Sequence, residues 1–210
     1  MERERITISI KKSVLGKVDQ FIDGINIRNR SHAFETLALK AMGQGNSKHA
    51  VIMLGGDDAL ELVPMVMASI KQLSEIGFEK VIIALGFLGE KVKAKIASEQ
   101  NFGIQIDYLE KGEGSGGALN QLKDTFTETF IVFNSSYQLD VNLNKLLSFH
   151  REHNSVATIA TDSLEDFDGI YIFEPAIYGY LGEGFSMIEE NLLPKLFGDN
   201  KAIIYPAKQA

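Results

Sequence analysis

The sequence predicts an α/β protein in two parts: a small strand–helix–helix segment, and a larger mixed sheet with helices on both faces. Residues 5–10 alternate polar and apolar side chains, as a strand does, and two helical patterns follow them. After residue 49, short apolar runs alternate with further helical patterns, which is typical of a largely parallel, covered sheet. We therefore expect units at residues 1–43 and 49–210, joined by a Gly-rich linker at residues 44–48.

The first strand carries Ile6, Ile8 and Ile10 on one face and polar side chains on the other. No second strand follows nearby in the sequence, although the apolar face needs cover and the strand edge needs a partner. Pairing with the same strand of a second copy would supply both, so we expect a homodimer.

Two helices are expected after this strand. Ser13 is a candidate N-cap for a helix that ends at Gly24, and Ser31 is a candidate N-cap for a helix that ends at Gly43. A segment of this size buries too little apolar surface to be stable alone, which again favours pairing.

The run Arg-Ile-Thr-Ile-Ser-Ile from residue 5, with the basic residues 28–34 after it, resembles ribbon-helix-helix DNA-binding domains. The resemblance implies a dimer whose β-ribbon enters the major groove of double-stranded DNA. The implied base contacts are Arg5, Thr7 and Ser9, and the implied phosphate contacts are Lys11, Lys12, Arg28, Arg30, Ser31 and His32. The alternative is an N-terminal dimerisation hairpin that binds no DNA.

Charge is divided unevenly along the chain. Residues 1–48 carry nine Lys and Arg against five Asp and Glu, whereas residues 49–210 carry twelve against twenty-three. A basic first part would suit DNA, and the acidic remainder would be repelled by it. Cysteine is absent, which excludes disulfides and thiolate chemistry. No apolar run is long enough to span a membrane, so we expect a cytoplasmic protein without a membrane partner.

The larger part alternates strands and helices. Strands are expected over residues 50–54, 80–85, 104–109, 130–133 and 156–160, and helices over residues 63–76, 90–97, 118–126 and 143–153. In such sheets ligands bind at the carboxyl ends of the strands. His150 and His153 are expected on the exposed face of their helix, and residues 162–168 in a solvated acidic loop.

Residues 49–206 resemble sugar-phosphate nucleotidyltransferases. The resemblance rests on the runs 50–56, 75–88, 110–119, 130–134, 169–175 and 185–196. It implies a Rossmann-like mixed sheet of the GT-A type, a Gly-rich nucleotide-binding loop, and Mg²⁺ held by an aspartate after the fourth strand.

The chain departs from that family where the chemistry is most demanding. Asp57, Asp58 and Glu61 follow the first Gly-Gly pair, where the family places cations for the triphosphate. Ser136 stands where the family has its metal aspartate. We therefore expect no catalytic residue, no metal site and no cofactor.

The glycines remain. They allow a ligand to approach the backbone closely, and a helix N-terminus offers free N–H groups. The candidate nucleotide-binding residues are Gly55, Gly56, Gly112, Gly114, Ser115, Gly116 and Gly117. The alternative is that they are turn residues without a ligand.

The function expected from these patterns is a sequence-specific DNA-binding transcriptional regulator. Its inactive nucleotidyltransferase-like unit would sense a nucleotide or nucleotide-sugar effector, or hold the oligomer together. Two alternatives remain open: an active sugar-phosphate nucleotidyltransferase with an N-terminal dimerisation arm, and an antitoxin-like regulator that binds a protein partner.

Overall fold

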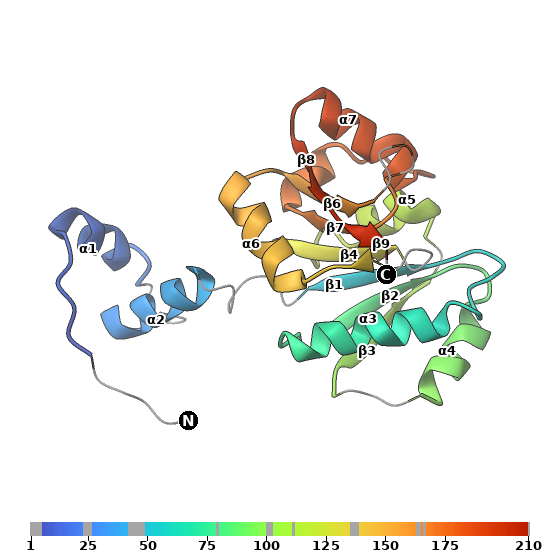
Figure 1. The fold of residues 1–210 in the computed structure, drawn as a ribbon, viewed down its shortest axis with the longest axis horizontal. Coiled ribbons are helices and arrows are strands. Elements are labelled where there is room, and N and C mark those ends of the chain that lie inside the picture. Colours follow the sequence, from blue (N-terminus) through green and yellow to red (C-terminus); the bar gives the residue numbers. More distant parts are fainter. Residues whose placement is uncertain are drawn as a thin grey trace. The chain divides into compact units, whose positions relative to one another are not determined.

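In a computed structural model, the chain divides into two compact units, Met1–Gly45 and Asn46–Ala210 (Figure 1). They are called the first unit and the second unit below. The structure describes residues 6–22, 27–41, 49–78, 80–99, 103–110, 112–134, 139–162, 165 and 167–209. The predicted linker at residues 44–48 lies outside these residues.

The first unit contains two helices, α1 (Lys12–Asp19) and α2 (Arg30–Ala41). Neither begins at the predicted serine. Lys11 occupies the N-cap position of α1, so Ser13 lies inside the helix. Ahead of α2, Oδ1 of Asn29 accepts a hydrogen bond of 2.9 Å from the backbone N–H of His32, so Asn29 takes the capping role expected of Ser31.

An ion pair joins the two helices. Nε and Nη2 of Arg30 donate to the two carboxylate oxygens of Asp19, at 2.7 and 2.8 Å. The hydrogen bond from Arg30 and the positive charge of its guanidinium hold the pKa of the Asp19 carboxyl below its ordinary value. Arg30 therefore has a structural partner within the chain.

Residues 6–11 form no strand in the single chain. The side chains of Ile6, Ile8 and Ile10 are 74%, 55% and 37% exposed. Among the described residues of this unit, the buried hydrophobic side chains are Val18 and Ala33. The first unit thus has a small core and an uncovered apolar segment.

The second unit is built on one mixed sheet. Its strands lie in the order β3-β2-β1-β4-β7-β6-β8. β1, β2, β3 and β4 run parallel, β7 is antiparallel to both β4 and β6, and β8 is parallel to β6. The bounds are β1 Ala50–Leu54, β2 Lys80–Leu85, β3 Gln105–Leu109, β4 Phe130–Asn134, β6 Ala157–Thr161, β7 Ile170–Phe173 and β8 Ala202–Pro206. A small second sheet pairs β5 (Leu139–Asp140) with β9 (Lys208–Gln209).

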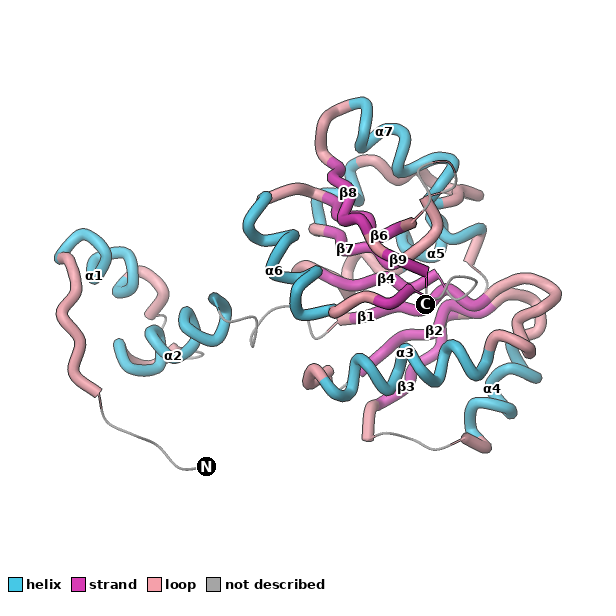
Figure 2. Tube along the Cα trace, in the orientation of Figure 1, coloured by secondary structure: helices cyan, strands magenta, loops and turns pink. Residues whose placement is uncertain are grey.

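Helices cover both faces of this sheet (Figures 1 and 2). One face packs against α3 (Val63–Glu75), α4 (Gly89–Ala97) and α6 (Leu143–His153). The other packs against α5 (Gly114–Gln121), α7 (Leu193–Gly198), a 3₁₀ turn at Pro175–Gly179 and a π-helix at Ile188–Leu192. The predicted α/β fold with a mixed sheet is confirmed for this unit.

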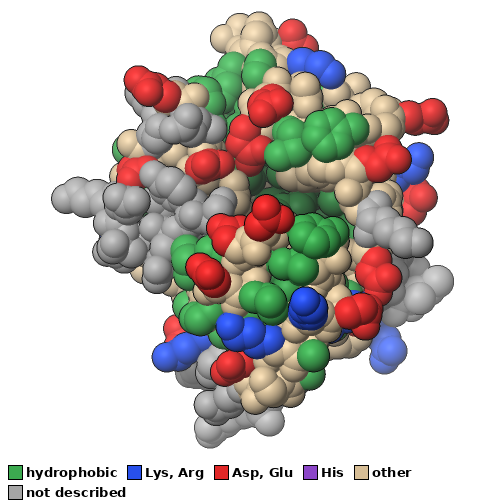
Figure 3. Space-filling model, turned by 90° about the vertical axis from the view of Figure 1, so that its right-hand side faces the viewer, with side chains coloured by type: hydrophobic (Ala, Val, Ile, Leu, Met, Phe, Trp, Pro, Cys, Tyr) green, Lys and Arg blue, Asp and Glu red, His purple; other side chains and the backbone are tan. Residues whose placement is uncertain are grey.

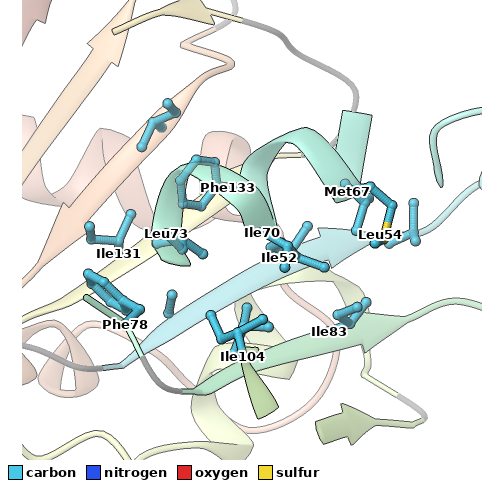
Figure 4. Close-up of a cluster of buried hydrophobic side chains, with 14 of the residues drawn as sticks. Ile52, Leu54, Met67, Ile70, Leu73, Phe78, Ile83, Ile104, Ile131 and Phe133 are labelled. Carbon is cyan, nitrogen blue, oxygen red and sulfur yellow. The ribbon is translucent and has the colours of Figure 1, made fainter. Parts of the chain in front are cut away.

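Alternation along β1 divides the core into two layers. Ile52 and Leu54 belong to the cluster beneath α3, whereas Val51 belongs to the cluster on the opposite face. Figure 4 shows Ile70 and Leu73 of α3 lying against the strand side chains in the first cluster. Full burial of each such side chain stabilises the fold by about 1.5–3 kcal/mol.

The predicted strands 50–54 and 80–85 and the predicted helix 143–153 have the predicted bounds. The helix predicted over residues 118–126 instead begins at Gly114, inside the glycine run, and ends at Gln121. The expected exposure of His150 is wrong. Its ring is 2% exposed and lies between Thr158 Oγ1 (2.8 Å from Nδ1) and Glu174 Oε1 (3.0 Å from Nε2).

Candidate functional site

A cavity of about 740 Å³ opens at the carboxyl ends of β1, β2 and β4, where ligands of α/β sheets bind. Figure 3 looks onto this side of the protein, where hydrophobic side chains lie in a hollow and acidic side chains stand around it. The lining residues are Met53, Leu54, Gly55, Gly56, Ala84, Leu85, Gly86, Gly112, Gly114, Ser115, Ala118, Asn134, Glu165, Phe167, Asp168, Met187, Glu189, Glu190 and Pro194.

One side of the cavity is bare backbone. Gly55 and Gly56 follow β1, and Gly86 follows β2. A Cβ on Gly86 would lie 3.0 Å from the Cα of Gly55. The ends of the two strands are therefore so close that a side chain at Gly86 would crowd the backbone of Gly55. Gly56 has φ of +90°, a conformation that glycine adopts readily. A flat group can therefore lie against this backbone.

The glycine run beside it has a second role. The N–H groups of Gly116 and Gly117 donate to the carbonyl oxygen of Ser186, at 2.8 and 3.3 Å. A Cβ on Gly114 would overlap that same oxygen. The expectation of free N–H groups at this helix start is therefore wrong for Gly116 and Gly117, which hold the segment before the π-helix.

The other predicted residues of this run line the cavity. They are Gly112, Gly114 and Ser115. Oγ of Ser115 accepts a hydrogen bond of 2.9 Å from the backbone N–H of Ile188, which fixes the start of the π-helix. Contact between these residues and a nucleotide stays a prediction.

The opposite side of the cavity is acidic. Nδ2 of Asn134, at the end of β4, donates to Oδ1 of Asp168 at 2.9 Å. The hydroxyl of Tyr171, on β7, donates to Oε1 of Glu189 at 2.6 Å. Glu165 and Glu190 also line the cavity, and among the lining residues that the structure describes every charged side chain is an acid. This side suits hydroxyl groups or cations and repels unshielded phosphate.

Sequence reasoning missed these carboxylates. Asp168 fell in a loop expected to be solvated, and only the fold brings it beside Asn134, 34 positions earlier. Glu189 lies in one of the runs that resemble the nucleotidyltransferases, and that resemblance was the available signal.

The residues behind the predicted loss of catalysis include Asp57, Asp58 and Ser136. Asp57 and Asp58 are exposed and are not among the cavity-lining residues of the described chain. Ser135 and Ser136 lie outside the described residues. No group of three or more acidic or imidazole side chains arranged for a metal ion occurs in the part of the chain that the structure describes.

Most of the residues predicted to contact DNA are exposed in the structure. Arg5 lies outside the described residues. Thr7, Ser9, Lys11, Lys12, Arg28 and Ser31 are exposed, and His32 is half-buried. Arg30 is held by Asp19, as described above.

A family profile described as "Nucleotidyl transferase" matches residues 44–169, which is more than half of the chain. The chain belongs to the nucleotidyl transferase family. The match begins at the junction of the two units and gives no support to a DNA-binding domain before it.

Nucleotidyl transferases of known name are similar to this chain. The UTP–glucose-1-phosphate uridylyltransferase of Synechocystis is 25% identical over 182 residues, covering 63% of this chain and 47% of that protein. The catalytic subunit beta of zebrafish (Danio rerio) mannose-1-phosphate guanylyltransferase is 27% identical over 146 residues, covering 66% of this chain and 39% of that protein. The chain thus spans less than half the length of these two relatives.

Solved structures agree on the fold. The structure of a putative glucose-1-phosphate thymidylyltransferase from Bacillus anthracis matches 77% of this chain and 87% of its own, with a TM-score of 0.64 and 14% identity.

These comparisons contradict the expected function. The relatives are sugar-phosphate nucleotidyltransferases, so the predicted DNA-binding transcriptional regulator, and the prediction that the protein is not an enzyme, are wrong. The physical error was to read the missing cations as the loss of the site, although the cavity and its hydrogen-bonded carboxylates are formed.

No helix in the described residues is long and apolar enough to cross a membrane.

Proposed function

We propose that the second unit transfers a nucleotidyl group from a nucleoside triphosphate to a sugar 1-phosphate. The observation that carries this proposal is the cavity itself, which joins bare glycine backbone to hydrogen-bonded carboxylates in a nucleotidyl transferase. Relatives named for glucose 1-phosphate and mannose 1-phosphate support a hexose 1-phosphate as acceptor.

In this reaction a phosphate oxygen of the sugar 1-phosphate attacks the α-phosphorus of the triphosphate. A new P–O bond forms there, the bond from the α-phosphorus to the bridging oxygen breaks, and pyrophosphate leaves. Catalysis of this kind rests on positioning and on neutralising phosphate charge. We assign the nucleotide to the backbone of Gly55, Gly56 and Gly86, and the sugar to the side formed by Asp168 and Glu189.

A divalent cation fits this arrangement in part. The described lining residues carry only negative charge, so the triphosphate needs a counter-charge that they do not supply. Asp168 offers the hard oxygen donor that Mg²⁺ prefers, and phosphate oxygens and water complete such sites when the protein gives only one or two carboxylates. When bound, the cation would neutralise phosphate charge; Asn134 would orient the carboxylate that holds it.

The test is pyrophosphate release by the full chain with Mg²⁺, pairing UTP, GTP or dTTP with glucose 1-phosphate or mannose 1-phosphate. We expect release that needs both substrates. Gly55→Leu places a side chain into the cavity mouth and should lower kcat/KM at least tenfold. Gly179→Leu is the matched control: a Cβ at either glycine meets nothing within 4 Å, and Gly179 does not line the cavity. Absence of release from every pair would overturn the proposal.

We also propose that the first unit joins two copies of the chain through residues 6–10. The alternating isoleucines of this segment are exposed, and its backbone has no strand partner among the described residues of the single chain. Antiparallel pairing with its own copy would cover the isoleucines and supply the missing backbone hydrogen bonds.

A further inference from the structure

Beneath the acidic side of the cavity lies a fully buried phenol. Tyr171 is 0% exposed, and its ring stacks against Phe173 at 5.7 Å between centroids. Its hydroxyl donates to Oε1 of Glu189 at 2.6 Å and also contacts the side chain of Asn134, which donates to Asp168. The pKa of Tyr171 is raised far above its ordinary value, mainly by burial and secondly by the negative charge of Glu189. The hydroxyl therefore stays protonated and remains a donor.

Glu189 has its backbone and its side chain fixed by different partners. The π-helix that carries it begins where Ile188 donates to Oγ of Ser115, and Oδ1 of Asn191 accepts from the N–H of Met187 at 2.7 Å. π-Helical turns are rare and often occur at functional sites. The position of the backbone is thus fixed without Tyr171, whereas among the described residues the hydrogen bond to the side chain of Glu189 comes from Tyr171.

The chemistry of this carboxylate selects its ligand. An ionised carboxylate only accepts hydrogen bonds and has room for several, so one bond from Tyr171 leaves capacity for donors from a ligand. Sugar hydroxyls are such donors. A carboxylate on the sugar would instead be repelled, because the charged residues among the described cavity lining are all acids: Glu165, Asp168, Glu189 and Glu190.

We propose that Tyr171 is a positioning residue for the sugar: its buried hydroxyl aims Glu189 into the cavity, where this carboxylate accepts hydrogen bonds from the hydroxyl groups of a neutral hexose 1-phosphate. The inference rests on the proposed function and adds two claims to it. The sugar is bound through a carboxylate that Tyr171 orients, and a sugar that carries its own carboxylate reacts more slowly.

The chain offers a matched control. The hydroxyl of Tyr178 is also buried but has no hydrogen-bond partner among the described residues. Its ring stacks against Phe130 at 6.1 Å between centroids in the same hydrophobic cluster. Tyr178→Phe and Tyr171→Phe therefore remove the same atom from the same core, and only one of them touches the cavity network.

The experiment measures KM for glucose 1-phosphate, KM for the nucleoside triphosphate, and kcat for both variants in the full chain. Tyr171→Phe should raise KM for the sugar phosphate about tenfold, because one hydrogen bond to a charged group is lost, and should raise KM for the triphosphate by a smaller factor. Tyr178→Phe should leave all three constants near wild type. In the wild type, glucuronic acid 1-phosphate should react at least tenfold more slowly than glucose 1-phosphate. Glu189→Gln should bring the two reaction rates closer together.

A binding titration with the nucleotide sugar separates the two proposals. Turnover with an unchanged sugar KM in Tyr171→Phe would overturn this inference and leave the proposed function standing. Nucleotide-sugar binding without turnover, weakened about tenfold by Tyr171→Phe alone, would support the inference and overturn the function. Neither binding nor turnover in the wild type would overturn both.

Discussion

Gly114 shows how one residue can carry a constraint from a distant segment. Its φ is +75°, and a Cβ there would overlap the carbonyl oxygen of Ser186. The glycine content of residues 112–117 is plain in the sequence and suggested a ligand. Its packing partner lies 72 positions later, and local sequence gives no sign of that contact.

Gly114→Ala should lower the free energy of unfolding of the second unit by about 2–4 kcal/mol, because backbone strain and steric overlap both act there. Denaturant titration of the full chain measures it. Gly179→Ala is the comparison, since its Cβ meets nothing within 4 Å, and it should change stability by about 0.5 kcal/mol or less. Equal effects at the two sites would show that the contact with Ser186 is not formed.

At the scale of elements, the strands were the most predictable part. β1 and β2 are short, continuous apolar runs bounded by glycine, and their bounds follow from that pattern. α5 was predicted too late, because glycine is a poor helix former and the hydrogen bonds from Gly116 and Gly117 to the distant Ser186 help to hold the helix there. The acidic side of the site was not predictable, since it joins residues from three separate elements.

α6 is linked to the sheet by a chain of polar groups in which His150 and Thr158 are buried and Glu174 is partly exposed. His150 of α6 lies between Thr158 of β6 and Glu174, and Thr129 also donates to Glu174 at 2.7 Å. The hydrogen bond from His150 holds the pKa of the Glu174 carboxyl below its ordinary value of 4.5. His150→Ala should cost about 1–3 kcal/mol of stability, because Thr158 is left buried without this partner.

The sign of the acid dependence follows from that lowered pKa. The unfolded chain takes up the proton at higher pH than the folded one, so this stabilisation is complete above pH 4.5 and is lost as pH falls through the folded pKa. Glu174→Gln should therefore lose less stability than wild type on going from neutral pH to below 4.5, measured by denaturant titration. Glu128→Gln, at an exposed position, should change the loss of stability on acidification less than Glu174→Gln does. A larger effect of Glu128→Gln would contradict the assignment of this acid dependence to Glu174.

At the scale of the whole molecule, the chain joins a small basic unit to a larger acidic one. The sequence alone indicated this division through its charge and its change of pattern. What it could not supply is the role of the second unit: three acids after Gly56 suggested an inactive site, but Asp57 and Asp58 do not line the cavity in the described chain.

Self-association should depend on the isoleucine face of residues 6–10. Ile8→Asp places a charge where the copies are proposed to meet and should shift the full chain from dimer to monomer in sedimentation equilibrium. Thr7→Asp adds the same charge on the opposite side of the strand and should leave the dimer intact. A wild-type chain that is monomeric at all accessible concentrations would contradict the proposal.

The most direct test of the account is where a nucleotide sugar binds to the full chain. We predict that a crystal structure with UDP-glucose or GDP-mannose places the nucleotide against Gly55 and Gly86 and the sugar hydroxyls within hydrogen-bonding distance of Glu189. A ligand bound elsewhere on the chain, or no binding of either compound by titration at millimolar concentration, would contradict it.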